Sequence, residues 1–330
     1  MYYFSHFYVN VFEHSTNQPN SFLFKNLKQT KMKKFFLMAG FALLAASCSN
    51  EESLDSSVNP SNDQVLAPVT VTTTGFEVSQ GEFTGRRAEE SVGEYEYVKA
   101  LTLAFFKSDG TQVYKCTHIK NDPSTFTTFG EFSTSLPLGS YTMVVMGYNR
   151  TQELTLTSST VASFGGAMCE TFIDKQEISI TNNTAVNLTA TLHRIVTALG
   201  VRSTDNRPAG VTHLRITYSA GGKSFNPMTG LAASNTGFSD LITFGSAVGA
   251  TTYSGSYLFL ATDEQTMDIT IETLDGANGN VLFSKTVTNV PLKRNRQTTL
   301  QGPLFTGGTA NAGSFKVESG WITPGNTINF

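Results

Sequence analysis

The chain has 330 residues, of which 39% are hydrophobic and 15% are charged, and its formal net charge at pH 7 is −3. This composition is sufficient for a hydrophobic core, and without residues 1–47 the chain is long enough for one large or two ordinary domains. The slightly acidic balance and the lack of a Lys/Arg cluster argue against a nucleic-acid partner.

Residues 32–47 have the three parts of a secretion signal. Two lysines supply the positive charge, and Phe35 to Leu44 is an apolar run that is too short for a membrane-spanning helix of about 20 residues. Small residues then lead to Ser47 and Cys48. This ending resembles the lipobox of bacterial lipoproteins, which implies cleavage between Ser47 and Cys48 and a diacylglycerol on the Cys48 sulfur. The alternative is an ordinary signal peptide followed by a chance cysteine.

Residues 1–31 precede this signal and show no sustained helical or strand periodicity. Because a signal peptide acts from the N-terminus, we expect translation to start at Met32 and residues 1–31 to be a non-native upstream extension. The polar, acidic stretch behind Cys48 resembles the export tags of surface lipoproteins in diderm bacteria. We therefore expect the mature chain to be tethered to the outer membrane and exposed on the cell surface.

Residues 48–94 contain a spacer, a strand and a polar loop. Residues 49–64 are rich in Ser, Asn and Asp, which is typical of a flexible spacer. Apolar and polar side chains alternate in residues 69–78, which predicts a strand with one buried face. The loop that follows carries Arg86 and Arg87, a candidate cleavage site for an arginine-specific protease. The alternative is that the two arginines are a solvated pair in an uncut loop.

Alternating apolar residues and turn signals such as Asp109-Gly110 continue to residue 305, and long helical periodicity is absent. This pattern predicts an all-β fold with a first β-sandwich domain at residues 95–201 and a second at residues 202–305. In the Gly/Ser-rich segment 220–256 we expect Leu241, Ile242 and Phe244 to be buried. The predicted strands are residues 97–107, 111–118, 141–148, 177–188, 189–201, 211–219, 257–260, 267–274, 281–290 and 298–304.

The chain has three cysteines. With Cys48 assigned to lipid, Cys116 and Cys169 remain. In an oxidising envelope these two are a candidate disulfide, and two buried free thiols are equally compatible with the sequence. Both alternatives stay open at this point.

Residues 306–330 form a separate linker and C-terminal strand. Phe315, Val317 and Trp321 share one face of this strand, and Trp321 is the single tryptophan of the chain. These three residues make the segment a candidate donor strand for a neighbouring subunit. The alternative is that it packs as the last strand of its own domain.

The sequence contains no recognisable catalytic motif: it has no Gly-x-Ser-x-Gly, His-Glu-x-x-His, phosphate-binding loop or Cys-x-x-Cys. His118, His193 and His213 are scattered over strand patterns, which favours surface or packed residues. Residues 275–280 loosely resemble a calcium loop but lack its closing glutamate. We therefore expect a protein that is not an enzyme and holds no metal or other cofactor.

Three further segments carry a resemblance to a known family. They are residues 136–149 (LPLGSYTMVVMGYN), 192–201 (LHRIVTALGV) and 290–305 (VPLKRNRQTTLQGPLF). In this order they resemble the fimbrillin family of diderm bacteria, which comprises lipoprotein-precursor pilus subunits and their accessory and anchor subunits. Together with the lipobox, the resemblance covers most of residues 32–305.

The resemblance implies two transthyretin-like β-sandwich domains in series and export to the outer membrane as a lipoprotein. In the structural subunits a trypsin-like, arginine-specific protease removes the N-terminal strand, and a strand from another subunit fills the groove. The implied partners are therefore other pilus subunits through β-strand addition and the membrane through the lipid. Host or bacterial surface receptors are further candidate partners. Anchor members of the family keep their lipid.

These points together predict a structural or adhesive subunit of a cell-surface pilus (fimbria). One alternative is a pilus membrane-anchor subunit that retains its lipid. Another is a surface-exposed glycan-binding β-sandwich lipoprotein, which would need exposed aromatic side chains as a platform for sugar. The single tryptophan lies in the terminal strand, and most Phe and Tyr residues fall in core patterns, which weighs against the glycan-binding alternative.

Overall fold

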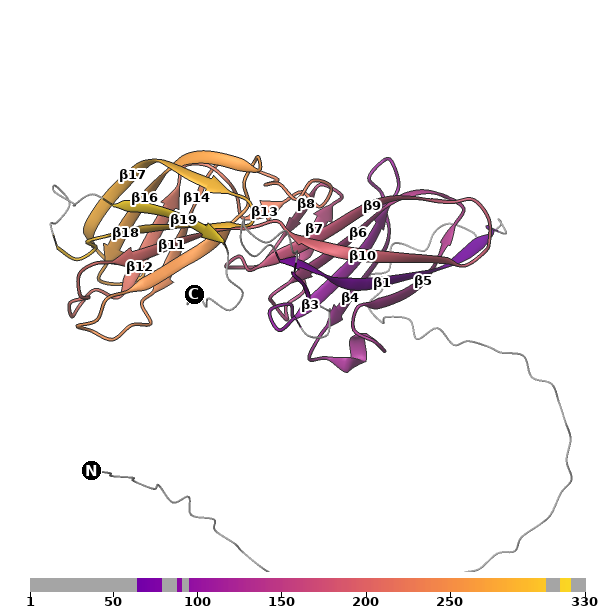
Figure 1. Cartoon of the computed structure of the whole chain (residues 1–330), viewed down its shortest axis with the longest axis horizontal. Helices are drawn as coiled ribbons and strands as arrows, with labels where there is room; N and C mark the ends of the chain where they lie inside the picture. The colour runs from indigo at the N-terminus through magenta and orange to yellow at the C-terminus, as the bar shows by residue number, and fades with distance from the viewer. Residues whose placement is uncertain (1–63, 79–87, 91–94, 307–314, 322–330) are drawn as a thin grey trace, which may run out of the picture. The chain divides into compact units, whose positions relative to one another are not determined.

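The computed structural model describes residues 64–78, 88–90, 95–306 and 315–321, and the regular secondary structure of these residues is almost entirely β-strand (Figure 1). The predicted all-β fold is thereby confirmed. Within this described part, no helix is long and apolar enough to cross a bilayer. The elements are β1 (Leu66–Val78), β2 (Ala88–Glu90), β3 (Ala100–Phe106), β4 (Gln112–Ile119), the 3₁₀ turn Pro123–Thr125, β5 (Glu131–Pro137), β6 (Gly139–Tyr148), β7 (Thr155–Ser158), β8 (Val161–Ser163), β9 (Thr171–Ile180), β10 (Val186–Arg194), β11 (Thr197–Ser203), β12 (His213–Tyr218), β13 (Ser224–Phe225), β14 (Phe238–Thr243), β15 (Tyr253–Leu258), β16 (Glu264–Leu274), β17 (Val281–Lys293), β18 (Arg296–Gly302) and β19 (Lys316–Trp321).

The first sandwich is one folded sheet of eight strands. Its order is β2-β1-β10-β9-β6-β3-β4, and β5 also pairs with β1. The β10–β9 ladder contains two paired positions, so the sheet folds there into two layers. One hydrophobic cluster contains Val71 and Leu192 from the first layer and Leu103 and Phe172 from the second. The layers therefore face each other across a shared core, as in a β-sandwich.

Strands β3 and β6 are buried on both faces. Leu103 and Val145 belong to the core of the first sandwich, whereas Ala104 and Met146 belong to a second hydrophobic cluster on the other face. That second cluster also contains Phe225 of the small sheet β13-β8-β7. Burial on both faces explains why these two strands read as continuous apolar runs instead of strict alternation.

The second sandwich consists of sheets β15-β11-β18-β19 and β14-β12-β16-β17. Its core contains Leu199, Ile216 and Leu300. The predicted domain limit at residue 201 differs from the observed pairing, because β11 pairs with β15 and β18 in the second sandwich. The chain changes sheets at Ile195 and Val196, and no turn residue in the sequence marks this crossing.

Two predicted turns are supported by their hydrogen bonds. In the β3–β4 hairpin Gly110 has φ +84°, and the Thr111 amide donates to Asp109 Oδ1 at 2.9 Å. In the β16–β17 hairpin the Asn280 amide donates to Asp275 Oδ1 at 2.6 Å. The Asp275 carboxylate therefore stabilises its own turn, which agrees with a structural turn at residues 275–280.

Candidate functional site: the N-terminal strand and its groove

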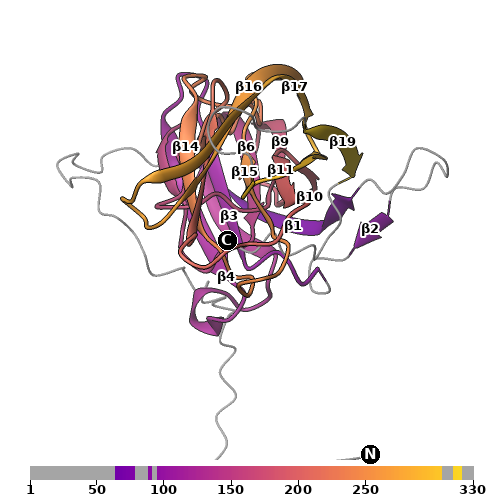
Figure 2. The same ribbon diagram turned by 90° about the vertical axis from the view of Figure 1, so that its left-hand side faces the viewer.

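Strand β1 is hydrogen-bonded along both edges. It runs parallel to β10, with Val69 opposite Val186 and Val71 opposite Leu188. On its other edge it runs antiparallel to β5, where Val71 is opposite Phe132. It also pairs with β2, which lies beside it in Figure 2. An N-terminal segment thus occupies an interior position of its sheet.

One face of β1 fills the core of the first sandwich. The buried side chains on this face are Ala67, Val69, Val71 and Phe76, all at most 1% exposed. A register shift between Thr73 and Gly75 interrupts the ladder with β10. Because a bulge adds one residue, it keeps Phe76 on the buried face. The predicted strand at residues 69–78 is therefore confirmed, and it begins at Leu66.

Phe76 sits in an aromatic pocket at the end of this face. Its ring centroid lies 4.9 Å from that of Tyr95 and 5.1 Å from that of Phe172. Gly147 of β6 leaves the space that the Phe76 ring occupies. The pocket is therefore shaped for an aromatic side chain supplied by the strand in the β1 position.

A buried ion pair lies beside this pocket. Arg194 Nε donates to Glu170 Oε1 at 2.8 Å, and the exposed fractions of the two side chains are 0% and 4%. Tyr95 Oη donates to the same carboxylate oxygen at 2.9 Å and accepts from Arg194 Nη2 at 3.2 Å. Burial, reinforced by the nearby Glu170 charge, raises the pKa of Tyr95 well above its ordinary value, so its hydroxyl stays protonated.

Arg194 also connects the two sandwiches. Its Nη1 donates to Asn295 Oδ1 at 2.8 Å, and the Asn295 amide donates to the Val196 carbonyl at 2.9 Å. Two of the three family-like segments, residues 192–201 and 290–305, therefore meet at this point. Sequence reasoning did not single out Tyr95 or Glu170. The available signal was a charged residue, Arg194, inside an apolar strand pattern, because such a charge needs a partner when buried.

The remaining family-like segment has a structural role. Tyr141 Oη donates to the Pro137 carbonyl at 2.8 Å. This bond spans the turn from β5 to β6 and fixes the angle between them. The Leu-Pro-x-Gly-x-Tyr spacing is therefore explained by one side-chain to backbone hydrogen bond.

The C-terminal strand β19 pairs with its own chain. It runs antiparallel to β18, with Val317 opposite Leu300 and Trp321 opposite Arg296. Val317 remains 40% exposed, whereas Phe315 is partly buried against the second core. The candidate donor strand thus lies, in this structure, at the edge of its own second sandwich.

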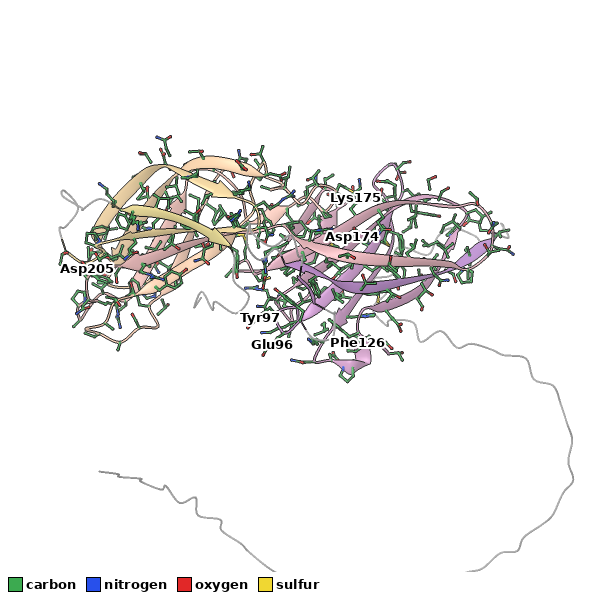
Figure 3. The ribbon with its side chains drawn as sticks, viewed as in Figure 1. Glu96, Tyr97, Phe126, Asp174, Lys175 and Asp205 are labelled. Atoms are coloured by element: carbon green, nitrogen blue, oxygen red, sulfur yellow. The ribbon has the colours of Figure 1, made fainter. Side chains whose placement is uncertain are left out.

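Asp205 fixes the chain just before the tail (Figure 3). Its carboxylate accepts from the amides of Leu304, Phe305 and Thr306 at 2.8 to 2.9 Å and from the Thr306 hydroxyl at 2.9 Å. Burial disfavours the charge, but these donors outweigh burial and lower the pKa of Asp205. The start of the tail is therefore set by one ionised side chain.

The candidate Cys116–Cys169 disulfide is not formed in this structure, because Cys169 is a free, buried thiol. Cys116 faces the core of the first sandwich, whereas Cys169 belongs to the cluster on the other face of the β3 and β6 layer. Strand periodicity could not reveal that the two cysteines face different cores. Burial raises the pKa of Cys169 to about 12, which makes it a poor nucleophile at neutral pH.

The other predicted positions lie outside the described residues. They are Ser47 and Cys48 of the lipobox, Arg86 and Arg87 of the cleavage loop, and the upstream residues 1–31. The Trp321 backbone is described, but its side chain is not. The lipid, the cleavage and the start at Met32 therefore stay predictions.

Other kinds of site find little support in the described part of the chain. It holds no group of three or more residues that could bind a metal ion. His118 is buried and its Nδ1 accepts from the Gly130 amide at 3.3 Å, as expected for a packed residue. A cleft of about 460 Å³ is lined by residues that include Ile195, Met228 and Arg294, and none of its lining residues is Phe, Tyr or Trp. A sugar platform would need such rings.

Several solved structures are similar to this chain. The fimbrial anchor protein Mfa2 from Porphyromonas gingivalis has 13% identity and a TM-score of 0.43, with 78% of this chain and 99% of that chain covered. A candidate polysaccharide-binding protein from Bacteroides thetaiotaomicron has 11% identity and a TM-score of 0.44, with 78% and 98% covered. A candidate adhesin from Bacteroides ovatus has 12% identity and a TM-score of 0.43, with 81% and 98% covered. Similarity at this level carries no functional information.

Comparison with curated protein sequences finds no significant match. A family model described as DUF6562, family of unknown function, matches residues 68–327. This match begins within β1 and extends beyond β19, so it includes both sandwiches. The chain therefore belongs to the DUF6562 family.

Proposed function

We propose that this chain is a structural or adhesive subunit of a cell-surface pilus, exported as a lipoprotein through Cys48 and assembled by exchange of β-strands. The observation that carries the proposal is β1, an N-terminal strand that fills a core and pairs on both edges. Its removal would leave unpaired backbone groups on β5 and β10 and a row of apolar pockets. Such a groove is a binding site for another extended chain.

The position of the two arginines fits a cut that frees β1. Val78 of β1 is opposite Ala88 of β2, so Arg86 and Arg87 lie in the sequence that connects these two strands. Between Cys48 and Tyr95 the chain has no other Arg and no Lys. Between Cys48 and Tyr95 a trypsin-like protease would therefore have one site to cut. After this cut, β1 would be held by non-covalent contacts alone.

The C-terminal segment matches the pattern of side chains that the groove requires. Along β10, the positions that face buried β1 residues are 186, 188, 190 and 192, opposite Val69, Val71, Thr73 and Phe76. A strand with a two-residue period can place Phe315, Val317, Ser319 and Trp321 at these positions. In this register Val317 takes the place of Val71, the Ser319 hydroxyl that of Thr73 and the Trp321 ring that of Phe76. The fourth residue of the tail, Phe315, is larger than the valine it replaces.

Strand exchange would also improve the burial of the tail. In its own chain β19 pairs with β18 and Val317 is 40% exposed. In a neighbour's groove the tail would pair with both β10 and β5, and Val317 would take the place of Val71, which is 0% exposed. Each additional Å² of buried apolar surface contributes about 25 cal/mol. Once β1 has left the groove, apolar burial therefore favours the exchanged state.

A second candidate is a pilus anchor subunit that keeps both its lipid and β1. The observation that favours it is that β1 and β19 are both paired within one chain, which leaves the β1 groove filled. Such a subunit would end a polymer at the membrane. The third alternative, a glycan-binding lipoprotein, is disfavoured because no Phe, Tyr or Trp side chain lines the cleft.

The test is limited digestion of purified full-length precursor with an arginine-specific protease. We expect ladders of oligomers from the digested wild type and none from an Arg86→Ala/Arg87→Ala variant or a chain truncated after Gly313. Val317→Asp should also block polymerisation, whereas Lys316→Asp, on the opposite face, should not. Digested wild type that stays monomeric would exclude the strand-exchange role and favour the anchor. Polymerisation of the truncated chain would exclude the tail as donor.

Two further experiments test location. Cys48→Ala should abolish incorporation of labelled fatty acid and release the protein or leave it as precursor, because stable attachment needs two acyl chains or more. Electron microscopy with antibodies to residues 95–305 should label filaments along their length. Label at filament bases would indicate an anchor, and label without filaments would favour a glycan-binding lipoprotein.

A further inference from the structure

Phe76 of β1 covers one side of the buried Tyr95–Glu170–Arg194 cluster. Its ring contacts those of Tyr95 and Phe172, and all three side chains are fully buried. The Arg194 guanidinium carbon lies 5.1 Å from the centroid of the Phe172 ring. The strand in the β1 position is therefore part of the apolar wall that keeps water away from the cluster.

The ion pair in this cluster depends on that wall. In a dry environment Arg194 and Glu170 are tightly paired in a fixed geometry, because water does not compete for their hydrogen bonds. When water enters, each charge can be solvated separately and the constraint on the guanidinium orientation weakens. The fixed orientation of the Arg194 guanidinium group therefore depends on the Phe76 ring, which helps to keep water out of the cluster.

On the other side, the cluster holds the turn that begins β18. Asn295 has φ +59° and accepts from Arg194, and its amide bonds to Val196. The next carbonyl, that of Arg296, accepts from Thr197 Oγ1 at 2.8 Å. Arg296 is also the residue of β18 that faces Trp321 of β19. The edge on which β19 docks is therefore fixed at one end by the cluster.

We propose that the Tyr95–Glu170–Arg194–Asn295 cluster couples the presence of β1 in the first sandwich to the docking of β19 in the second. With Phe76 in place, the cluster is dry, the turn at Asn295 is held and β19 is docked. Without Phe76 the turn loosens and β19 detaches more readily. Because such coupling is reciprocal, the loss of β19 also weakens the docking of β1. The coupling acts within a single chain and does not require polymerisation.

Hydrogen exchange on the uncut, full-length monomer tests the coupling. Phe76→Ala should raise the exchange rate of the β19 amides, residues 316–321, by about 5-fold or more. Val69→Ala is the matched control, because Val69 is an equally buried residue of the same strand that is not in the aromatic contacts of Tyr95. It should raise exchange in β1, β5 and β10 and raise β19 exchange far less than Phe76→Ala does. Phe76→Leu serves as a milder variant if the alanine variant fails to fold.

A double-mutant cycle locates the coupling in the cluster. Asn295→Gly retains access to a positive φ and removes the side-chain link to Arg194. It should raise β19 exchange on its own, and Phe76→Ala should then add no further increase. Independent, multiplicative effects of the two substitutions would overturn the proposal. Equal effects of Phe76→Ala and Val69→Ala on β19 would do so as well, because they would report general destabilisation.

The reciprocal measurement uses the chain truncated after Gly313. Its β1 amides, residues 66–78, should exchange faster than those of the full-length chain. Unchanged β1 exchange in the truncated chain would contradict the coupling. Both readouts come from monomers, so a failure of protease-induced polymerisation would refute the strand-exchange role and leave the coupling intact. A failure of the coupling would likewise leave the strand-exchange role intact.

Discussion

The Phe76 ring takes the space that a side chain at Gly147 would need. A Cβ atom built on Gly147 would lie 3.1 Å from Phe76 Cε1 and 2.9 Å from Leu192 Cδ2. These distances are shorter than ordinary van der Waals contacts. The absence of a side chain in β6 thus permits the aromatic anchor of β1 to enter the core.

Gly147→Ala should destabilise the first sandwich by about 1–3 kcal/mol, because the added methyl group overpacks a filled core. The free energy of unfolding from urea denaturation measures this. Gly245→Ala is the control, since nothing lies within 4 Å of a Cβ built there. In the Gly147→Ala background, Phe76→Leu should cost less than in the wild type. Additive losses would contradict the contact.

Glu170→Gln should destabilise the protein by about 3–5 kcal/mol, because it leaves the fully buried Arg194 charge without a counter-charge. Glu264→Gln is the matched control. Glu264 pairs with Lys293 at the surface, where the side chains are 68% and 53% exposed, so its substitution should cost far less than that of Glu170. Equal losses in the two variants, measured by urea denaturation, would refute the role assigned to the buried pair.

His118 should make stability fall as the pH is lowered from about 6.5 to about 4. Burial lowers its pKa to about 4, whereas an unfolded histidine titrates near 6.5, so the unfolded state binds the extra proton in this window. The integrated loss at pH 4 is about 3 kcal/mol. His118→Phe removes the titrating group, and its unfolding free energy should change less over this range than that of the wild type. Parallel pH profiles would contradict a neutral buried His118.

Asp205→Asn should destabilise the protein by about 1.5–3 kcal/mol at pH 7, because hydrogen bonds to a charged acceptor become bonds to a neutral one. The folded-state pKa of Asp205 is depressed, so its contribution is fully present above about pH 4 and is lost as the pH falls through the folded value. The difference between wild type and variant should therefore shrink below pH 4. A difference that stays constant down to pH 2 would argue against the ionised clamp.

Strand alternation was predictable where one face of a strand is solvated. Leu214, Ile216 and Tyr218 alternate with more exposed residues, and all three are at most 1% exposed. Alternation also explains why one expectation about burial was wrong. Leu241, which was expected to be buried, is 46% exposed, whereas its neighbour Asp240 is 8% exposed and pairs with Lys223 at 2.5 Å. Hydrophobicity alone could not show that an ion pair turns Asp240 inward.

The strand β1 was predictable, but its surroundings were not. Val69 and Val71 alternate with polar residues, which is enough to indicate a buried face. Its parallel partner β10 follows more than 100 positions later, and nothing local specifies that pairing. Arg194 was visible as a charge within an apolar pattern, but its partners Glu170 and Asn295 come from distant parts of the sequence. Tertiary contacts of this kind are decided by packing rather than by local pattern.

The parallel pairing of β1 and β10 also dictates an order of folding. Thr74 and Thr191, which share a hydrogen bond, are 117 positions apart, so β1 is synthesised well before its partner β10. We expect the docking of β1 to be a late step, since closing so long a loop precedes any reward from the contacts. Until β1 docks, the backbone groups of β5 and β10 that pair with it are unpaired, and the Phe76 side chain is exposed to water. The interval between the synthesis of β10 and this closing step is thus the period in which another strand can compete for the same place.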